Sequence, residues 1–233
     1  MKHLITKKQI ILSCLFNGSN TIIWLYFFIT TLNPKTFLYL TSLSGDLNSI
    51  YLYLCLTCDI SNYFFKSSKL NSLNNFIRNY FSHVINPISY FVTFLFWGLF
   101  LMGGMDEMNN LYDIFFNIYE HIFITIFIIL DILIADHTKH IFSGIILGFI
   151  YIYLVFYGLL CGFSTFILDY PPYPFLQKIK KYILFIYCII FIIIMFFCYY
   201  LHILIYKIKD KFVNRTSVLV NESIESNTTA SKI

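Results

Sequence analysis

Charged side chains are scarce in this sequence of 233 residues. Only 12% of the residues are Asp, Glu, Lys or Arg and 58% are hydrophobic, whereas an ordinary soluble domain carries about 25% charged residues. The shortage of charge excludes a water-soluble globule. The net charge of +4 is small, and in so apolar a chain it reports membrane topology rather than nucleic-acid binding.

The commonest catalytic motifs are also missing. The chain holds no Walker A glycine loop, no H-E-x-x-H metal motif and no G-x-S-x-G nucleophile motif. Its six cysteines lie within apolar stretches, where they behave as small buried residues rather than as a disulfide framework. The sequence therefore predicts neither a metal nor another cofactor.

Long apolar blocks, by contrast, are abundant. A helix of about 20 apolar residues spans the ~30 Å hydrocarbon core of a bilayer, and the blocks predict an all-α polytopic membrane protein with a bundle of six transmembrane helices. The predicted helices cover residues 9–32, 37–59, 87–105, 111–135, 141–168 and 182–206. Residues 1–206 thus form one transmembrane domain. The Ser-, Thr- and Asn-rich residues 207–233 are expected to form a disordered cytosolic tail.

The distribution of Lys and Arg predicts the orientation. With both termini in the cytosol, 12 of the 16 basic residues lie on the cytosolic side, Arg78 among them. The first block is longer than a signal-peptide core, and no small-x-small cleavage site follows it, so it is counted as a helix. We expect an integral multi-pass protein of an endomembrane or the plasma membrane.

Polar residues within two of the apolar blocks form stripes. Such residues are costly in a bilayer and usually face the bundle interior. At about 100° per residue, one stripe on the second predicted helix comprises Thr41, Ser44, Gly45, Asn48 and Cys55. A stripe at four-residue spacing on the fourth predicted helix comprises Asp113, Asn117, His121 and Thr125, with Glu120 and Asp131 on its flank.

The two stripes suggest acyl chemistry. Both helices are predicted to enter from the outer side, which places Thr41 and His121 in the same leaflet. A hydroxyl is a weak nucleophile alone, and a neutral imidazole within ~3 Å can take its proton. Each residue has an alternative role. A Thr in a membrane helix usually donates a hydrogen bond to the carbonyl four residues back. A buried His serves as readily in a proton relay.

Three short motifs resemble those of one family, the FAR-17a/AIG1-like membrane proteins. Residues 37–41, Phe-Leu-Tyr-Leu-Thr, resemble the family's Lys-Tyr-Leu-Thr motif. Asn117, His121 and Asp131 stand at the spacings of the Asn, the His and the acidic residue of the family's fourth helix. Residues 173–176, Tyr-Pro-Phe-Leu, resemble its motif before the last helix. The three motifs occur in the family's order and at its spacing, and together they span most of the chain. The chain therefore resembles a divergent member of this family.

The resemblance implies a function. Family members hydrolyse fatty acid esters of hydroxy fatty acids with a Thr nucleophile and a His, and these roles fall by motif on Thr41 and His121. The implied protein is a membrane threonine hydrolase whose lipid ester substrate enters from the bilayer. Asn117 is expected to orient His121 or to bind the oxyanion. Further supporting candidates are Ser44, Asn48, Thr125 and Asp131.

Two other classes of function stay open. A transporter or proton-coupled channel would use the fourth-helix stripe and Asp131 as a relay, although the sequence shows neither an inverted repeat nor a second ionisable helix to complete a path. A non-catalytic scaffold would rely on small residues of the fifth predicted helix that permit close helix packing. These residues are Gly144, Gly148, Gly158 and Gly162.

Overall fold

The computed structural model describes residues 6–30, 39–101, 111–134, 144–168 and 181–230, and it contains helices but no strand within these ranges. The elements are α1 (Lys7–Thr30), α2 (Leu40–Phe65), α3 (Ser68–Phe76), η2 (Ile77–Phe81), α4 (Ser82–Leu101), α5 (Leu111–Ile118), η3 (Tyr119–Phe123), α6 (Ile124–Ile134), α7 (Gly144–Phe166) and α8 (Lys181–Ala230). Both η segments are π-helices that continue their neighbours, so α3, η2 and α4 form one rod and α5, η3 and α6 another. The described residues thus form six helical rods, and the predicted all-α bundle is confirmed.

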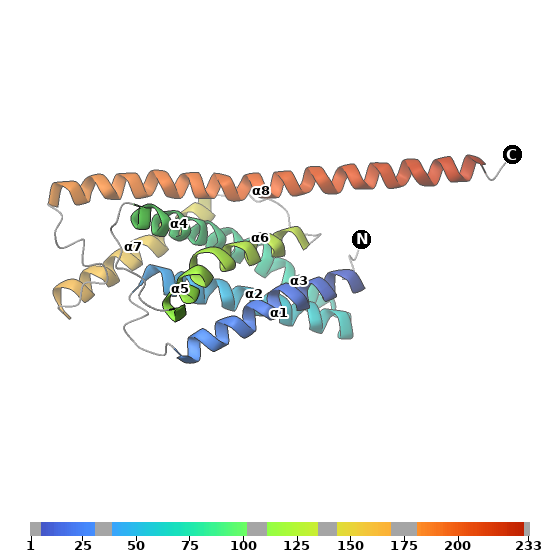
Figure 1. Ribbon diagram of the computed structural model, residues 1–233. Helices are drawn as coiled ribbons and strands as arrows, with labels where there is room; N and C mark the ends of the chain where they lie inside the picture. The colour runs from blue at the N-terminus through green and yellow to red at the C-terminus, as the bar shows by residue number, and fades with distance from the viewer. Residues whose placement is uncertain (1–5, 31–38, 102–110, 135–143, 169–180, 231–233) are drawn as a thin grey trace.

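The rods run roughly along one direction, with α8 along one edge of the bundle and α1 along the opposite edge (Figure 1). The start of α1 and the end of α8 point toward the same end, as an even number of rods allows. Four segments are long and apolar enough to cross a membrane: Lys7–Thr30, Ile114–Ile134, Gly144–Thr165 and Ile189–Phe212. The protein is therefore a membrane protein, and the side on which its termini lie stays a prediction.

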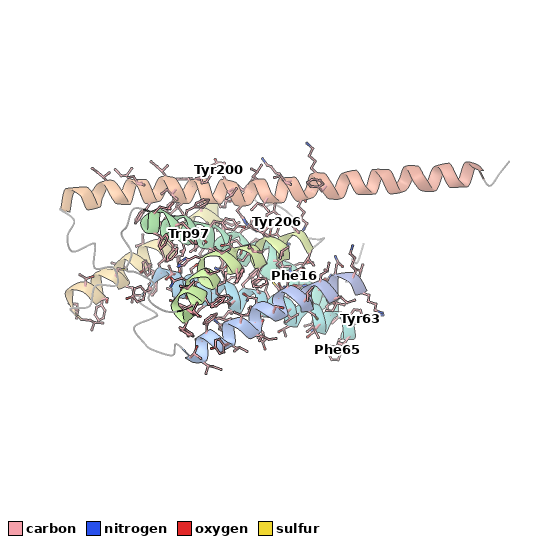
Figure 2. The ribbon with its side chains drawn as sticks, viewed as in Figure 1. Phe16, Tyr63, Phe65, Trp97, Tyr200 and Tyr206 are labelled. Atoms are coloured by element: carbon pink, nitrogen blue, oxygen red, sulfur yellow. The ribbon has the colours of Figure 1, made fainter. Side chains whose placement is uncertain are left out.

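The bundle has an apolar core and an apolar outer surface. Leu52 of α2, Ile128 of α6 and Met195 of α8 are completely buried in one apolar cluster. On α8, Tyr206 turns into the bundle and is fully buried, whereas Tyr200 turns outward with 58% of its surface exposed (Figure 2). An outer surface rich in large apolar side chains suits hydrocarbon rather than water.

The third rod differs from its prediction of residues 87–105. Helix begins at Ser68, and Pro87 lies inside α4 instead of at its start. The sequence predicts Arg78 on the cytosolic side, outside the membrane helices, but Arg78 is buried in the bundle. Arg78 is therefore not a loop cation, because two buried carboxylates accept its hydrogen bonds.

The predicted disordered tail also differs from the structure. α8 continues without a break from Lys181 to Ala230 and projects beyond the other helices (Figure 1). Neither Gly nor Pro occurs in this segment, so nothing in its backbone chemistry stops the helix. Lys209, at the start of the predicted tail, is only 2% exposed.

The glycines of α7 do not make the close packing that their spacing suggested. α7 packs against α4, but a Cβ atom built at any of the four glycines meets no atom of the described residues within 4 Å. The scaffold interpretation, which depended on Gly144, Gly148, Gly158 and Gly162, thus gains no support from the described contacts.

Candidate active site

The polar stripe of α2 points into the bundle, where Gly45 lies next to Glu120 and Ile124 of the fourth rod. Thr41 is the second residue of α2, directly after Leu40, whose N–H donates a hydrogen bond of 2.9 Å to the Tyr157 hydroxyl of α7. Asp59 follows Thr41 by five full helical turns at 3.6 residues per turn, so both lie on one face. Asp59 contacts Arg78 of η2, at the start of the α4 rod. Ser44 and Asn48 on this face are buried, which confirms that the stripe points inward.

Several threonine hydroxyls of the chain bond within their own helices. The hydroxyls of Thr21, Thr30 and Thr57 each donate to the carbonyl four residues back, at 2.8, 2.8 and 2.9 Å. Thr41 is half-buried, and its hydroxyl makes no hydrogen bond to any described residue. The carbonyl four residues before Thr41 belongs to residue 37, which lies outside the described residues.

His121 lies in η3, the five-residue π-helix Tyr119–Phe123 that interrupts the fourth rod. π-Helical turns are rare and occur frequently at functional sites. The imidazole is 1% exposed and stacks on the Phe96 ring of α4, with centroids 3.5 Å apart and an interplanar angle of 13°. Its Nδ1 is buried and has no hydrogen-bond partner among the described residues. A buried nitrogen held in this way is available to a bound molecule.

Thr125 shares the α4-facing side of the fourth rod with His121. Its hydroxyl lies 2.9 Å from that of Thr93, three residues before Phe96 on α4, so the predicted four-residue stripe faces α4 at these two positions. Asn117 is half-buried one turn before His121. The side chain of Asp113 lies outside the described residues.

α2 and η3 meet directly beside the two candidate residues. The Ser42 hydroxyl donates a hydrogen bond to the Glu120 carboxyl group, and these residues are the sequence neighbours of Thr41 and His121. Farther along α2, Ser49 Oγ lies 3.2 Å from the Tyr119 hydroxyl. Thr41 and His121, both described, form no hydrogen bond with each other, although their sequence neighbours do. Catalytic hydrogen bonds are often long without substrate and tighten when it binds.

Asp131, one of the supporting candidates from the sequence, lies away from His121. It lies ten residues farther along the rod, about 15 Å at ~1.5 Å per residue. Its Oδ1 accepts hydrogen bonds from Asn17 and Arg78, both at 2.8 Å, and its Oδ2 accepts one of 2.8 Å from Tyr51. Asp131 therefore belongs to a separate polar cluster, which we call the arginine cluster.

The arginine cluster joins five elements around the Arg78 guanidinium. The Asp59 carboxylate accepts from Arg78 at 2.9 and 3.2 Å, from Ser13 at 2.7 Å and from Asn74 at 2.8 Å. Sequence reasoning missed Asp59 and Arg78 as interior partners. One signal was available, because Asp59 continues the Thr41 face of α2 by whole turns.

A second buried polar cluster lies between α4 and α8. The rings of His83 and His202 meet edge to face with centroids 4.9 Å apart, and the Tyr206 ring lies 4.8 Å from that of His83. All three are completely buried. Among the described residues no group of three or more His, Cys, Asp or Glu is placed to hold a metal ion.

The model of the FAR-17a/AIG1-like protein family matches residues 11–209. The chain belongs to this family. The matched range includes Thr41, Asn117, His121 and Asp131, which the structure describes. It also includes the motif of residues 173–176, which lies outside the described residues. Searches of curated proteins and of solved structures find no significant match.

Proposed function

We propose that this chain is an integral membrane hydrolase that cleaves lipid esters with Thr41 as nucleophile and His121 as general base. The observation that carries the proposal is that η3, with the buried His121 imidazole whose Nδ1 bonds no described residue, lies against the first turn of α2, where the Thr41 hydroxyl also bonds no described residue. Membership of a family whose motifs place a Thr and a His at these positions supports the same pair.

The reaction proceeds in two balanced steps. The Thr41 oxygen attacks the ester carbonyl while the His121 imidazole takes the hydroxyl proton. Collapse of the tetrahedral intermediate breaks the ester bond, and the alcohol leaves with the proton from His121. Water then attacks the acyl-threonine, again with His121 as base, which releases the fatty acid and restores the Thr41 hydroxyl.

The substrate is a long-chain ester that dissolves in the bilayer rather than in water. It reaches the site laterally from the outer leaflet, where Thr41 lies at the start of α2. Asn48 is a supporting residue on the Thr41 face: it is fully buried, and its Nδ2 donates to the Ser44 carbonyl at 2.7 Å. A polar group held in a dry site stabilises developing charge more than it would in water.

Purified full-length protein in detergent tests the proposal. Thr41→Ala and His121→Ala are each expected to reduce hydrolysis of a lipid ester to the background rate, and a fluorophosphonate probe is expected to label the wild type but not Thr41→Ala. Thr57→Ala is the matched control, because Thr57 is exposed and its hydroxyl bonds its own helix. Full activity of either Ala variant would exclude the proposed mechanism.

A transporter is the second candidate, and the arginine cluster favours it. Ionisable groups from α2, η2 and α6 meet there, which supplies the second ionisable helix that seemed to be missing from the sequence. However, every carboxylate oxygen of Asp59 and Asp131 already accepts a hydrogen bond, as expected of a structural link between helices.

Proton or solute flux in proteoliposomes, retained in Thr41→Ala, would support the transporter instead.

A further inference from the structure

Ser42 and Glu120 join the two elements that carry the proposed catalytic pair. Ser42 follows Thr41 in the first turn of α2, and Glu120 precedes His121 in η3. The Ser42 hydroxyl donates a hydrogen bond to the Glu120 carboxyl group. Because each partner is the neighbour of one catalytic residue, this bond ties the two backbones together where the reaction occurs.

The Glu120 carboxyl group lies against α2 at Gly45. An ideal Cβ atom at Gly45 would be in ordinary contact with Glu120 Oε1, at 3.7 Å, and in tight contact with Ile124 Cδ1, at 3.3 Å. The other nearby carboxylate, Asp46, is held by Trp24, whose Nε1 donates to it at 2.8 Å. Ser42 is thus the donor that fixes Glu120 on α2.

A second hydrogen bond joins the same elements and offers a comparison. Ser49 lies two turns beyond Ser42 on the same face of α2, and its Oγ lies 3.2 Å from the Tyr119 hydroxyl. Both serines therefore hold α2 against η3. Only the bond from Ser42 lies next to Thr41.

We propose that Glu120 is a positioning residue: its hydrogen bond from Ser42 holds the Thr41 hydroxyl at the distance and angle from His121 that proton transfer needs. This inference rests on the proposed function. A misplacement of about 1 Å in a catalytic group costs roughly 100-fold in rate. The role requires only an acceptor at position 120, so the Gln side chain fulfils it and the Leu side chain does not.

Steady-state hydrolysis by purified full-length variants tests the role. Ser42→Ala and Glu120→Leu are each expected to lower kcat by about 10-fold to about 100-fold with KM unchanged. Glu120→Gln and the matched control Ser49→Ala keep kcat within about twofold of the wild type. The double variant Ser42→Ala/Glu120→Leu falls no further than either single variant, because each change removes the same bond.

The possible outcomes separate this inference from the proposed function. Equal loss of kcat in Ser42→Ala and Ser49→Ala, or none in either, would overturn the positioning role, and that comparison decides the matter even if Glu120→Leu does not fold. A loss in Glu120→Gln as large as in Glu120→Leu would also overturn it. Failure of the proposed function has a different signature, namely full hydrolysis by Thr41→Ala or His121→Ala.

Discussion

The imidazole of His121 lies flat against the ring of Phe96, with centroids 3.5 Å apart. Phe96 belongs to α4, which also packs against α2. The stack therefore fixes the plane of the imidazole against α4.

Replacing the stacking ring is expected to lower turnover. Phe96→Leu keeps an apolar side chain but removes the flat surface, so the imidazole gains rotational freedom and kcat falls about tenfold. Phe91→Leu is the control, because Phe91 is equally well buried on α4 but its ring meets Phe191 of α8 instead. Equal turnover in the two variants would show that the stack does not orient His121.

Removing the cation of the arginine cluster is expected to destabilise the bundle. Arg78→Met leaves Asp59 and Asp131 buried without a counter-charge, which should lower the free energy of unfolding by about 3–5 kcal/mol. Thermal unfolding in detergent measures the effect. Lys69→Met, at an exposed position of α3, should leave the midpoint unchanged, and a similar midpoint for Arg78→Met would contradict a structural role of the cluster.

The glycines of α2 and α7 are expected to respond in opposite directions. A Cβ atom added at Gly45 would lie only 3.3 Å from Ile124 Cδ1. Gly45→Val therefore overpacks this contact and should lower the free energy of unfolding by about 1–3 kcal/mol. Gly148→Ala meets open space and should add about 0.5–1 kcal/mol, since Ala loses less backbone entropy than Gly in a helix. Unfolding curves of both variants provide the measurement, and a stabilised Gly45→Val would refute the close approach.

Asn48 offers a test of the supporting residues. Its Oδ1 is buried without a hydrogen-bond partner, so Asn48→Leu should change the free energy of unfolding by no more than about 1 kcal/mol. Hydrolysis should fall about tenfold or more, because a polar group of the site is lost. Asn86→Leu is a matched control in α4: the Asn86 side chain is also fully buried, with neither polar atom bonded. Unchanged hydrolysis by Asn48→Leu would remove Asn48 from the site.

The prediction of the fold succeeded where the signal was local. The number of helical rods was predicted correctly as six. The length and apolarity of a block depend only on neighbouring residues, so the sequence shows them directly. The start of the third rod was wrong, since Pro87 was read as a boundary and lies inside α4. Proline can remain within a helix when the surrounding bundle satisfies the freed backbone groups. The two π-helical segments had no signal in the spacing of apolar residues.

Periodicity indicated buried positions of two helices but not the partners of Asp131. Ser44, Asn48 and His121, which lie on the predicted polar stripes, are buried. The partners of Asp131 are Asn17, Tyr51 and Arg78, which are 114, 80 and 53 residues away in the chain. No periodic pattern within one helix specifies which distant helix supplies a partner.

The sequence by itself determined that this chain is a helical membrane protein and which side of two of its helices is polar, because hydrophobicity and periodicity are properties of short segments. Only the tertiary structure decided which polar residues meet. It buried Arg78 between Asp59 and Asp131, and it joined Ser42 to Glu120 beside Thr41 and His121. The physical reason is that a buried charge or polar group is stable only with a partner, and packing of distant segments chooses that partner.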